Sequence, residues 1–329
     1  MANKRFAKIY VEISNACNLA CDFCPSGVSD KEVSANTQSV PANTSQNPFI
    51  KTYVTADHLR HILREGRDLT EQFTFHVLGE PTAHPEFAKL VDIAHEENAP
   101  LNITTNGILI HKPEIQNALL SRAVQQVNFS LQSWTANFKI ENVQNYLTRV
   151  FAFIDRAQAE RPDLYINLRL WNFGSPEESL LHNLHFLKPL EEKFRTPLTE
   201  VNTNVEMKKS HKIEGRIYLH FDSRFEWPDP SQPVRSTTGH CYGLKNHIGI
   251  LANGTVVPCC LDSNGYINLG NIHDPRESEA YDSRLSEILA SPRAKKIYHG
   301  FEKHKLVEDL CQKCTYIQRF DSKLTTASI

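Results

Sequence analysis

The sequence predicts an α/β fold: a partial (β/α)6 barrel of the TIM type, followed by a small cysteine-rich domain with a β-hairpin. Three observations predict it: six strand-like segments alternate with helical patterns, the cysteines form two distant groups, and the composition changes after about residue 230. Strands that alternate with helices pair in parallel through right-handed crossovers. Six strands are too few for a closed eight-stranded barrel, but they suit an open one. The six segments are Phe6–Ile13, Phe73–Leu78, Leu101–Thr105, Val124–Leu131, Tyr165–Trp171 and Arg216–Phe221.

Helices are expected between these strands. Apolar residues between positions 87 and 94 recur with the i, i+3, i+4, i+7 spacing of an amphipathic helix, and a longer helix is expected around residues 146–154. Another helix begins at Ser175, Pro176 and Glu178, which supply an N-cap serine, a proline at the first helical position and an early acid. A further helix is expected to begin near Thr55.

The C-terminal part differs from the rest of the chain in composition and in its predicted elements. Prolines between residues 228 and 233 mark a linker, and Asn253-Gly254 lies inside the apolar segment Ile248–Val257. Asn-Gly between apolar runs is a strong hairpin signal, because both turn residues tolerate positive φ. A short helix at Leu285–Ile297 and a terminal Cys-x-x-Cys follow. We therefore expect two domains, residues 1–230 and residues 231–329, as the length also suggests.

Composition excludes several classes of protein. The 329 residues include 36 Lys and Arg against 38 Asp and Glu, a net charge of −2, and 40% are hydrophobic. This rules out a wholly disordered chain and a uniformly basic nucleic-acid coat. No apolar run approaches the ~20 residues of a membrane span, and no secretory signal is evident at the start. The expected location is the cytoplasm, with no membrane partner.

Residues 26–52 contain a polar insertion. Between positions 34 and 47, ten of fourteen residues are Ser, Thr, Asn or Gln. Such a stretch cannot order itself by burying apolar area. We expect a mobile surface insertion, or alternatively a lid beside the cysteines that precede it.

The first cysteine group follows the first predicted strand. Cys17, Cys21 and Cys24 lie within eight residues, and no fourth cysteine is nearby. Three thiolates can hold three irons of a four-iron, four-sulfur (4Fe-4S) cluster and leave one iron open. Zinc is the competing occupant, but this spacing is a poor zinc knuckle.

The run Cys17-x3-Cys21-x-Phe23-Cys24 resembles the radical S-adenosylmethionine (radical SAM) family. Gly79-Glu80-Pro81 resembles that family's Gly-Gly-Glu-Pro motif, although Leu78 replaces the first glycine. The resemblance implies a SAM site formed by the cluster and by these motifs. In addition to Phe23, Gly79, Glu80 and Pro81, the residues implied to contact SAM are Asn106 after the third strand, Ser130 and Gln132 near the ribose, and Arg169 near the methionine carboxylate.

The resemblance also implies a reaction. In this family the open iron binds SAM through its amino and carboxylate groups, and one electron cleaves SAM to methionine and a 5′-deoxyadenosyl radical. That radical takes a hydrogen atom from the substrate. The protein orients the reactants and excludes water.

The second cysteine group resembles the auxiliary-cluster domain known as SPASM, or its shorter twitch form. The resemblance covers about residues 239–316 and assigns Cys241, Cys259, Cys311 and Cys314 as ligands of a second 4Fe-4S cluster. Zinc is the alternative metal. Cys260 is left over: it is a buried side chain, an alternative ligand, or a hydrogen-atom donor to a substrate radical.

The sequence leaves the substrate open. A peptide or protein segment and a small metabolite are favoured, whereas RNA is a minority alternative that rests on basic patches at residues 208–212 and 291–305. A flavodoxin- or ferredoxin-type electron donor is expected. A different class also stays open: a non-catalytic iron–sulfur or zinc-binding protein.

Overall fold

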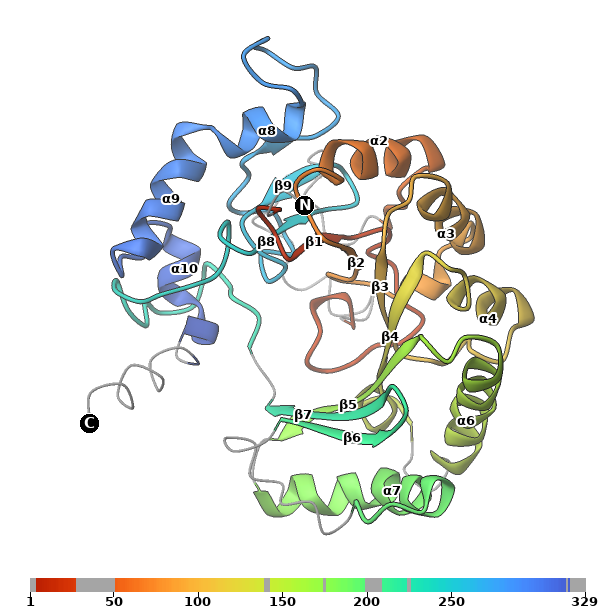
Figure 1. Ribbon diagram of the computed structural model, residues 1–329. Helices are drawn as coiled ribbons and strands as arrows, with labels where there is room; N and C mark the ends of the chain where they lie inside the picture. Colours follow the sequence, from red (N-terminus) through yellow and green to blue (C-terminus); the bar gives the residue numbers. More distant parts are fainter. Residues whose placement is uncertain are drawn as a thin grey trace. The chain divides into compact units, whose positions relative to one another are not determined.

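The computed structural model confirms an α/β chain (Figure 1). Two compact units divide it: unit 1 contains residues 1–16, 23–79 and 225–329, and unit 2 contains residues 17–22 and 80–224. Most of the predicted lid lies outside the described residues. The structure describes residues 4–27, 51–138, 143–173, 176–198, 209–223, 226–317 and 319.

Unit 1 contains strands in the order β10-β9-β8-β1-β2. The predicted hairpin is confirmed: β8 and β9 are antiparallel, and Gly254 in their turn has φ 85°. The hairpin also pairs with the first strand, because β8 runs parallel to β1 with Ile248 opposite Ile9. The strands are β1 (Lys8–Val11), β2 (Phe73–Phe75), β8 (His247–Ile250), β9 (Thr255–Val257) and β10 (Gly270–Asn271).

The helices of unit 1 begin at recognisable caps. The Thr55 side chain accepts the His58 N–H and so caps α2 (Ala56–Gly66), as the sequence predicts. The single helix predicted at Leu285–Ile297 is wrong: the segment forms α8 (Arg284–Leu289) and α9 (Pro292–Glu302). Ser291 caps α9, and Pro292 occupies its first turn because proline has no N–H to continue a helix from α8. The short helix α10 (Asp309–Lys313) follows.

The described part of unit 2 contains four parallel strands and one antiparallel strand, in the order β3-β4-β5-β7-β6. Its helices α3, α4 and α6 run along one side of β3, β4 and β5 (Figure 1). The strands are β3 (Leu101–Thr105), β4 (Val124–Ser130), β5 (Tyr165–Phe173), β6 (Ser210–Glu214) and β7 (Ile217–Ser223). The helices are α3 (Phe87–Glu96), α4 (Pro113–Leu119), α5 (Gln132–Thr135), α6 (Val143–Glu160) and α7 (Pro176–Phe194).

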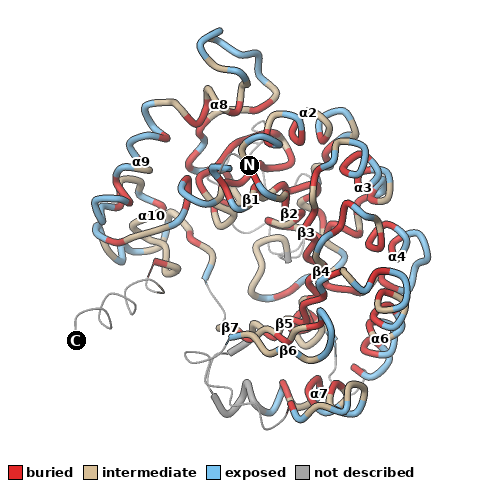
Figure 2. The backbone as a smooth tube through the Cα atoms, viewed as in Figure 1, coloured by how far each residue is buried: buried red, intermediate tan, exposed pale blue. Residues whose placement is uncertain are grey.

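The two faces of this sheet differ in chemistry. Side chains in register on parallel strands share a face. One row of residues in register is apolar and fully buried: Phe129, Leu168 and Leu219. The Phe129 ring contacts the ring of Phe153 on α6, with 5.7 Å between the centroids. The apolar face therefore packs against the helices, which bury their own inner sides (Figure 2).

The opposite face is polar. Asn128 is fully buried; its Nδ2 donates to Asn102 Oδ1 and its Oδ1 accepts from Asn167 Nδ2. Buried amides are stable when they satisfy one another in this way. Across the described ranges, none of the helices is long and apolar enough to span a bilayer.

Candidate functional site

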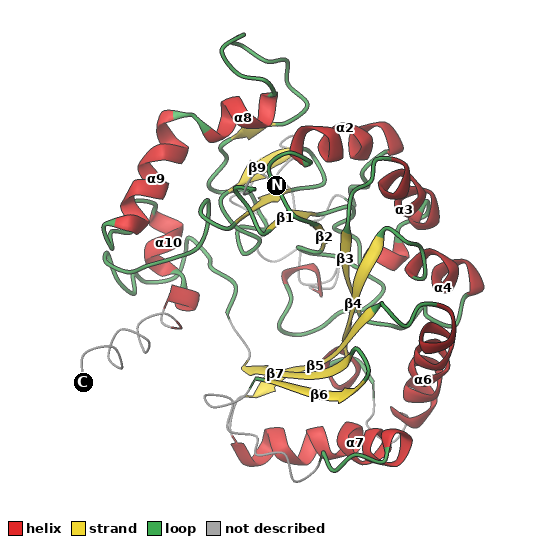
Figure 3. Cartoon of the chain, viewed as in Figure 1, coloured by secondary structure: helices red, strands yellow, loops and turns green. Residues whose placement is uncertain are grey.

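Most of the expected SAM contacts lie in unit 2, at or near the carboxyl ends of parallel strands. Figure 3 shows these neighbouring strands, β3, β4 and β5. Asn106 directly follows β3, Ser130 ends β4, and Arg169 lies on β5 in register with Ser130. Gln132 begins α5, and its Oε1 is buried without a hydrogen-bond partner among the described residues. Ligands collect at the carboxyl ends of parallel strands. The arrangement therefore suits a binding site.

Glu80 is the buried carboxylate of this site, with 2% of its surface exposed. It caps the short 3-10 helix that begins at Pro81. Oε1 accepts the N–H and hydroxyl of Thr82 and the hydroxyl of Thr105, whereas Oε2 accepts the Asn106 N–H at 2.7 Å. Burial raises the pKa of Glu80, and these hydrogen bonds oppose that shift. With one donor on Oε2, the carboxylate can still accept an ammonium group.

Asn106 connects Glu80 to the first cysteine group. Its Nδ2 donates to Asn18 Oδ1 at 2.8 Å and lies 3.9 Å from Cys17 Sγ. Its Oδ1 accepts the Ile108 N–H at 3.0 Å, which fixes the orientation of the amide. The loop after β3 thus holds the cysteine loop and the buried carboxylate at once.

Arg169 lies on the polar face beside an aromatic ring and a histidine. Its guanidinium is 4.6 Å from the centroid of the Trp171 ring, and Nη1 donates to Thr104 Oγ1 at 3.3 Å. His220 of β7 is in register with Arg169, so Ser130, Arg169 and His220 form one row across three strands. Burial, and then the charge of Arg169, lower the pKa of His220. The row combines a hydroxyl, a cation and an imidazole.

The remaining expected contacts lie in unit 1. Gly79 has φ 70°, and a Cβ at this position would overlap the Ser14 carbonyl oxygen. Only glycine fits there, whereas Leu78, at the position of the family's first glycine, is a buried apolar side chain. Phe23 directly precedes Cys24, whose Sγ is 3.0 Å from Ser26 Oγ.

The second cysteine group gathers in unit 1. Cys259 follows β9, Cys311 lies in α10 and Cys314 ends that helix. All three and Cys241 are free thiols. Burial raises the pKa of Cys259 and of Cys311, and nearby thiolates, including that of Cys241, raise it further. Four neighbouring, half-buried thiols are a suitable ligand set for a 4Fe-4S cluster.

Cys260 has different surroundings from Cys259. It packs against Val77, Leu251 and Val257 and has a hydrogen bond with the Tyr10 side chain. Burial raises the pKa of Cys260 to about 11. Its thiol is therefore protonated at neutral pH, as a hydrogen-atom donor must be.

Within the described ranges, no three His, Cys, Asp or Glu side chains are arranged to hold a single metal ion.

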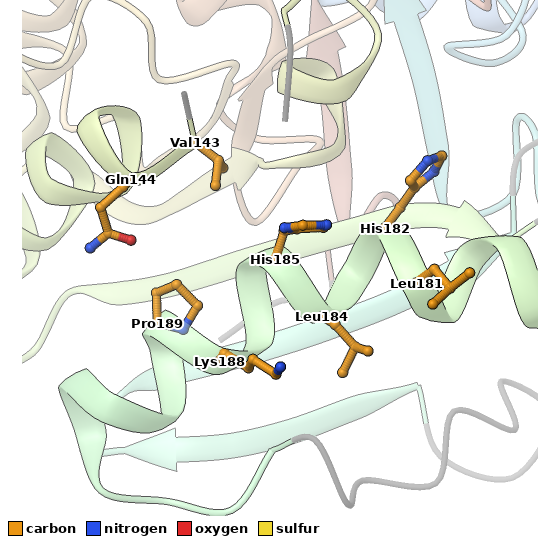
Figure 4. Close-up of a pocket in the computed structure, with 8 residues that line it drawn as sticks. All are labelled: Val143, Gln144, Leu181, His182, Leu184, His185, Lys188 and Pro189. Atoms are coloured by element: carbon orange, nitrogen blue, oxygen red, sulfur yellow. The ribbon is translucent and has the colours of Figure 1, made fainter. Parts of the chain in front are cut away.

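A cavity of about 430 Å³ lies elsewhere in unit 2, between the start of α6 and one side of α7. Val143, Gln144, Leu181, His182 and His185 are among its lining residues (Figure 4). None of the expected SAM contacts lines it. Because α6 packs on the apolar face of the sheet, this cavity is separate from the polar row.

Comparison with known proteins assigns the family. The radical SAM superfamily model matches residues 11–179, which is more than half of the chain. The chain belongs to the radical SAM superfamily. The SPASM model, described as an iron–sulfur cluster-binding domain, matches residues 241–315.

The cofactors follow from these two domains. The radical SAM domain binds a 4Fe-4S cluster and SAM, and the SPASM domain binds additional iron–sulfur clusters. Members of the superfamily are enzymes. The thiol sets described above fit such clusters, because each group supplies buried or half-buried cysteines without a disulfide.

Solved structures share the fold. The chain is similar to BtrN in complex with AdoMet and 2-DOIA, with 17% identity, a TM-score of 0.52, and coverage of 95% of this chain and 94% of that one. It is also similar to Streptococcus suis SuiB bound to S-adenosylmethionine, with 15% identity, a TM-score of 0.52, and coverage of 96% and 75%. These likenesses confirm the partial barrel followed by a cysteine-rich domain.

A curated relative covers less of the chain. The cofactor-modifying protein of the tungsten-containing aldehyde ferredoxin oxidoreductase from Pyrococcus furiosus is 26% identical over 123 residues. This match covers 37% of the chain and 30% of the relative.

Sequence reasoning missed three residues of this radical SAM chain. His220 lies on the polar face of the sheet, in register with Arg169. The sequence could have predicted this, because alternate residues of a strand face the same side and His220 is two positions after Tyr218 in the predicted strand Arg216–Phe221. Glu12 is buried at the end of β1 and accepts the N–H groups of Leu78 and Ala252. Asn137 holds the first cysteine loop, and no sequence pattern marks it.

Proposed function

We propose that this protein cleaves SAM reductively and uses the 5′-deoxyadenosyl radical to abstract a hydrogen atom from a polar substrate. The observation that carries the proposal is the position of Asn106. Its backbone N–H donates to Glu80 and its side chain donates to Asn18, between two cysteines of the first group. One residue thereby connects the cluster loop with Glu80, the carboxylate that we propose binds the methionine ammonium.

Each expected contact has a role that suits its surroundings. Cys17, Cys21 and Cys24 are proposed as the ligands of the SAM-binding cluster, which supplies the electron that breaks the sulfonium bond. Glu80 accepts the methionine ammonium and Arg169 pairs with its carboxylate, since both groups are opposite in charge to their partners. These roles leave Gly79 and Pro81 to shape the loop around Glu80.

The ribose and adenine contacts are assigned by position. Ser130 and Gln132 are proposed to bind the ribose hydroxyls, which the unpartnered Gln132 Oε1 supports. Phe23 is proposed to line the adenine side of the site, because it directly precedes a cluster ligand.

The auxiliary cluster is proposed to have Cys241, Cys259, Cys311 and Cys314 as its ligands and to pass electrons. A cluster with four protein ligands has no open iron for SAM. Cys260, which is protonated beside Tyr10, is proposed as a hydrogen-atom donor. A cytoplasmic flavodoxin- or ferredoxin-type protein is proposed as the electron donor.

The substrate is proposed to be a polar small metabolite or a polar peptide segment. The support is His220, which lies on the polar face of the sheet in register with Arg169 and has no proposed role in binding SAM. RNA is less well supported, because Arg293 pairs with Glu308 and Lys209 pairs with Asp222, so both basic patches are partly neutralised.

The test is SAM cleavage by the anaerobically reconstituted full chain with dithionite. We expect 5′-deoxyadenosine and methionine in equal amounts, and neither product from a variant with Cys17, Cys21 and Cys24 replaced by alanine. Absence of both products from a wild-type protein with verified clusters would support the non-catalytic alternative. Adding candidate polyols and peptides should then increase the turnover only for the true substrate class.

A further inference from the structure

Two asparagine side chains hold the first cysteine loop of unit 2 from two directions. Asn106 follows β3 and donates to Asn18 Oδ1. Asn137 lies two residues after α5; its Oδ1 accepts the Ala20 N–H at 2.8 Å and its Nδ2 donates to Cys21 Sγ at 3.0 Å. The residues of this loop are more than one hundred positions away from Asn137 in sequence, so the contact is tertiary.

The orientation of the Asn137 amide follows from its partners. A backbone N–H can only donate, so the atom that faces Ala20 must be the oxygen. The nitrogen has a second acceptor, the Ser133 carbonyl oxygen at 2.9 Å. Both constraints direct an N–H of Asn137 toward Cys21 Sγ.

Aromatic packing connects the segments that carry the two asparagines. Trp134, in the helix before Asn137, stacks on Tyr146 with 4.9 Å between ring centroids and 19° between planes. The Tyr146 hydroxyl donates to the Asn106 carbonyl oxygen at 2.9 Å, and Tyr146 is 2% exposed. The stacked rings of Trp134 and the buried Tyr146 therefore join the turn that carries Asn137 to the loop that carries Asn106.

An N–H directed at a cysteine sulfur has two effects on a cluster ligand. It fixes the position of the sulfur, and it stabilises the state with more negative charge. Since reduction adds an electron, the hydrogen bond raises the reduction potential of the cluster. Replacing the donor with an oxygen acceptor would reverse the interaction, because a carboxylate and a thiolate repel each other.

We propose that Asn137 is a positioning residue of the SAM-binding cluster, which orients Cys21 and raises the cluster's reduction potential through its amide N–H. The inference rests on the proposed function, because it takes Cys21 as a ligand. It adds a residue outside the cysteine motif on which reductive cleavage depends.

The test compares Asn137→Ala, Asn137→Asp and Asn137→Gln in the reconstituted full chain. The readouts are the iron content and the midpoint potential of the SAM-binding cluster. This cluster is identified as the one whose electron paramagnetic resonance signal changes on addition of SAM. We expect the alanine variant to shift to a more negative potential and to lose iron to a chelator several-fold faster. The aspartate variant should lose about half of its iron, and glutamine should restore part of the potential.

The matched control is Asn117→Asp. Asn117 is exposed on α4 and accepts from Arg156, so a carboxylate oxygen can replace its amide oxygen. Wild-type iron content and potential are expected for this variant. If the wild-type cluster responds to SAM but Asn137→Ala has the same potential and retains iron as the wild type does, the role of Asn137 is overturned and the proposed function is not. A wild-type protein without a SAM-responsive cluster would overturn the proposed function as well.

Discussion

Glu80 Oε2 accepts the backbone N–H of Asn106 at 2.7 Å, so one buried carboxylate holds two loops of unit 2 together. The loop at Glu80 precedes α3, whereas the loop at Asn106 follows β3. The same Asn106 donates from its side chain to the loop between Cys17 and Cys21. Loss of this carboxylate should therefore affect both SAM binding and local stability.

Replacing Glu80 with alanine should weaken SAM binding while both clusters remain. The change leaves the Thr82 and Asn106 N–H groups without their acceptor, which costs about 2–4 kcal/mol of unfolding free energy. Equilibrium dialysis and urea unfolding measure the two effects. The exposed Glu114→Ala variant is the control and should change neither quantity by more than about 0.5 kcal/mol. Unchanged SAM affinity in Glu80→Ala would remove this residue from the site.

Arg169→Lys should reduce SAM affinity about tenfold or more, because a lysine cannot form the paired hydrogen bonds that a guanidinium makes with a carboxylate. The cluster absorbance should be retained. Arg149→Lys, at an exposed position of α6, is the matched control. If both variants bind SAM as the wild type does, Arg169 only braces the polar face through Thr104 and Trp171.

Alanine variants of the adjacent Cys259 and Cys260 should differ in iron content. Two 4Fe-4S clusters hold about eight irons per chain. Cys259→Ala should reduce this number to about four, and Cys260→Ala should leave it unchanged. The reverse result would exchange the two assignments. Stoichiometric zinc with about four irons in the wild type would identify the second group as a zinc site.

Glu12→Gln should flatten the dependence of stability on pH. Burial raises the pKa of Glu12 from 4.5 to about 7. The folded state therefore holds this proton more tightly than the unfolded state does. The stability that this group contributes is complete below about pH 4.5, is lost as the pH rises toward 7, and amounts to about 3 kcal/mol.

Urea unfolding between pH 5 and pH 8 measures this effect. The wild type should lose more stability over the range than Glu12→Gln does, since glutamine cannot ionise. Glu71→Gln, at an exposed position, controls for the loss of one charge and should follow the wild type. Parallel curves for Glu12→Gln and the wild type would show that Glu12 is ionised in the folded protein throughout.

Local patterns predicted most of the secondary structure. The strands at Leu101–Thr105 and Val124–Ser130 coincide with apolar, β-branched segments. Thr55 caps α2, and Pro176 is the first residue of α7, whereas the predicted N-cap Ser175 lies outside the described residues. These features are local, since period and capping depend on a few neighbouring residues. The hairpin at Asn253-Gly254 is local for the same reason.

Long-range features could not be predicted in this way. The pairing of β8 with β1 joins segments about 240 residues apart, and no local pattern encodes that register. The bond from Asn137 to Cys21 depends equally on tertiary packing. Glu12 is an acid in a buried position, contrary to the usual distribution of carboxylates, so composition alone gives no reason to expect it in the core.

The proposed SAM cleavage requires that the cluster held by Cys17, Cys21 and Cys24 has an open iron that binds SAM. The most direct measurement is electron–nuclear double resonance on the reduced, reconstituted protein with SAM labelled at its amino nitrogen and carboxylate oxygen. We expect hyperfine coupling from both labels, which disappears in the variant with Cys17, Cys21 and Cys24 replaced by alanine. A reduced cluster that shows no coupling to either label would contradict it.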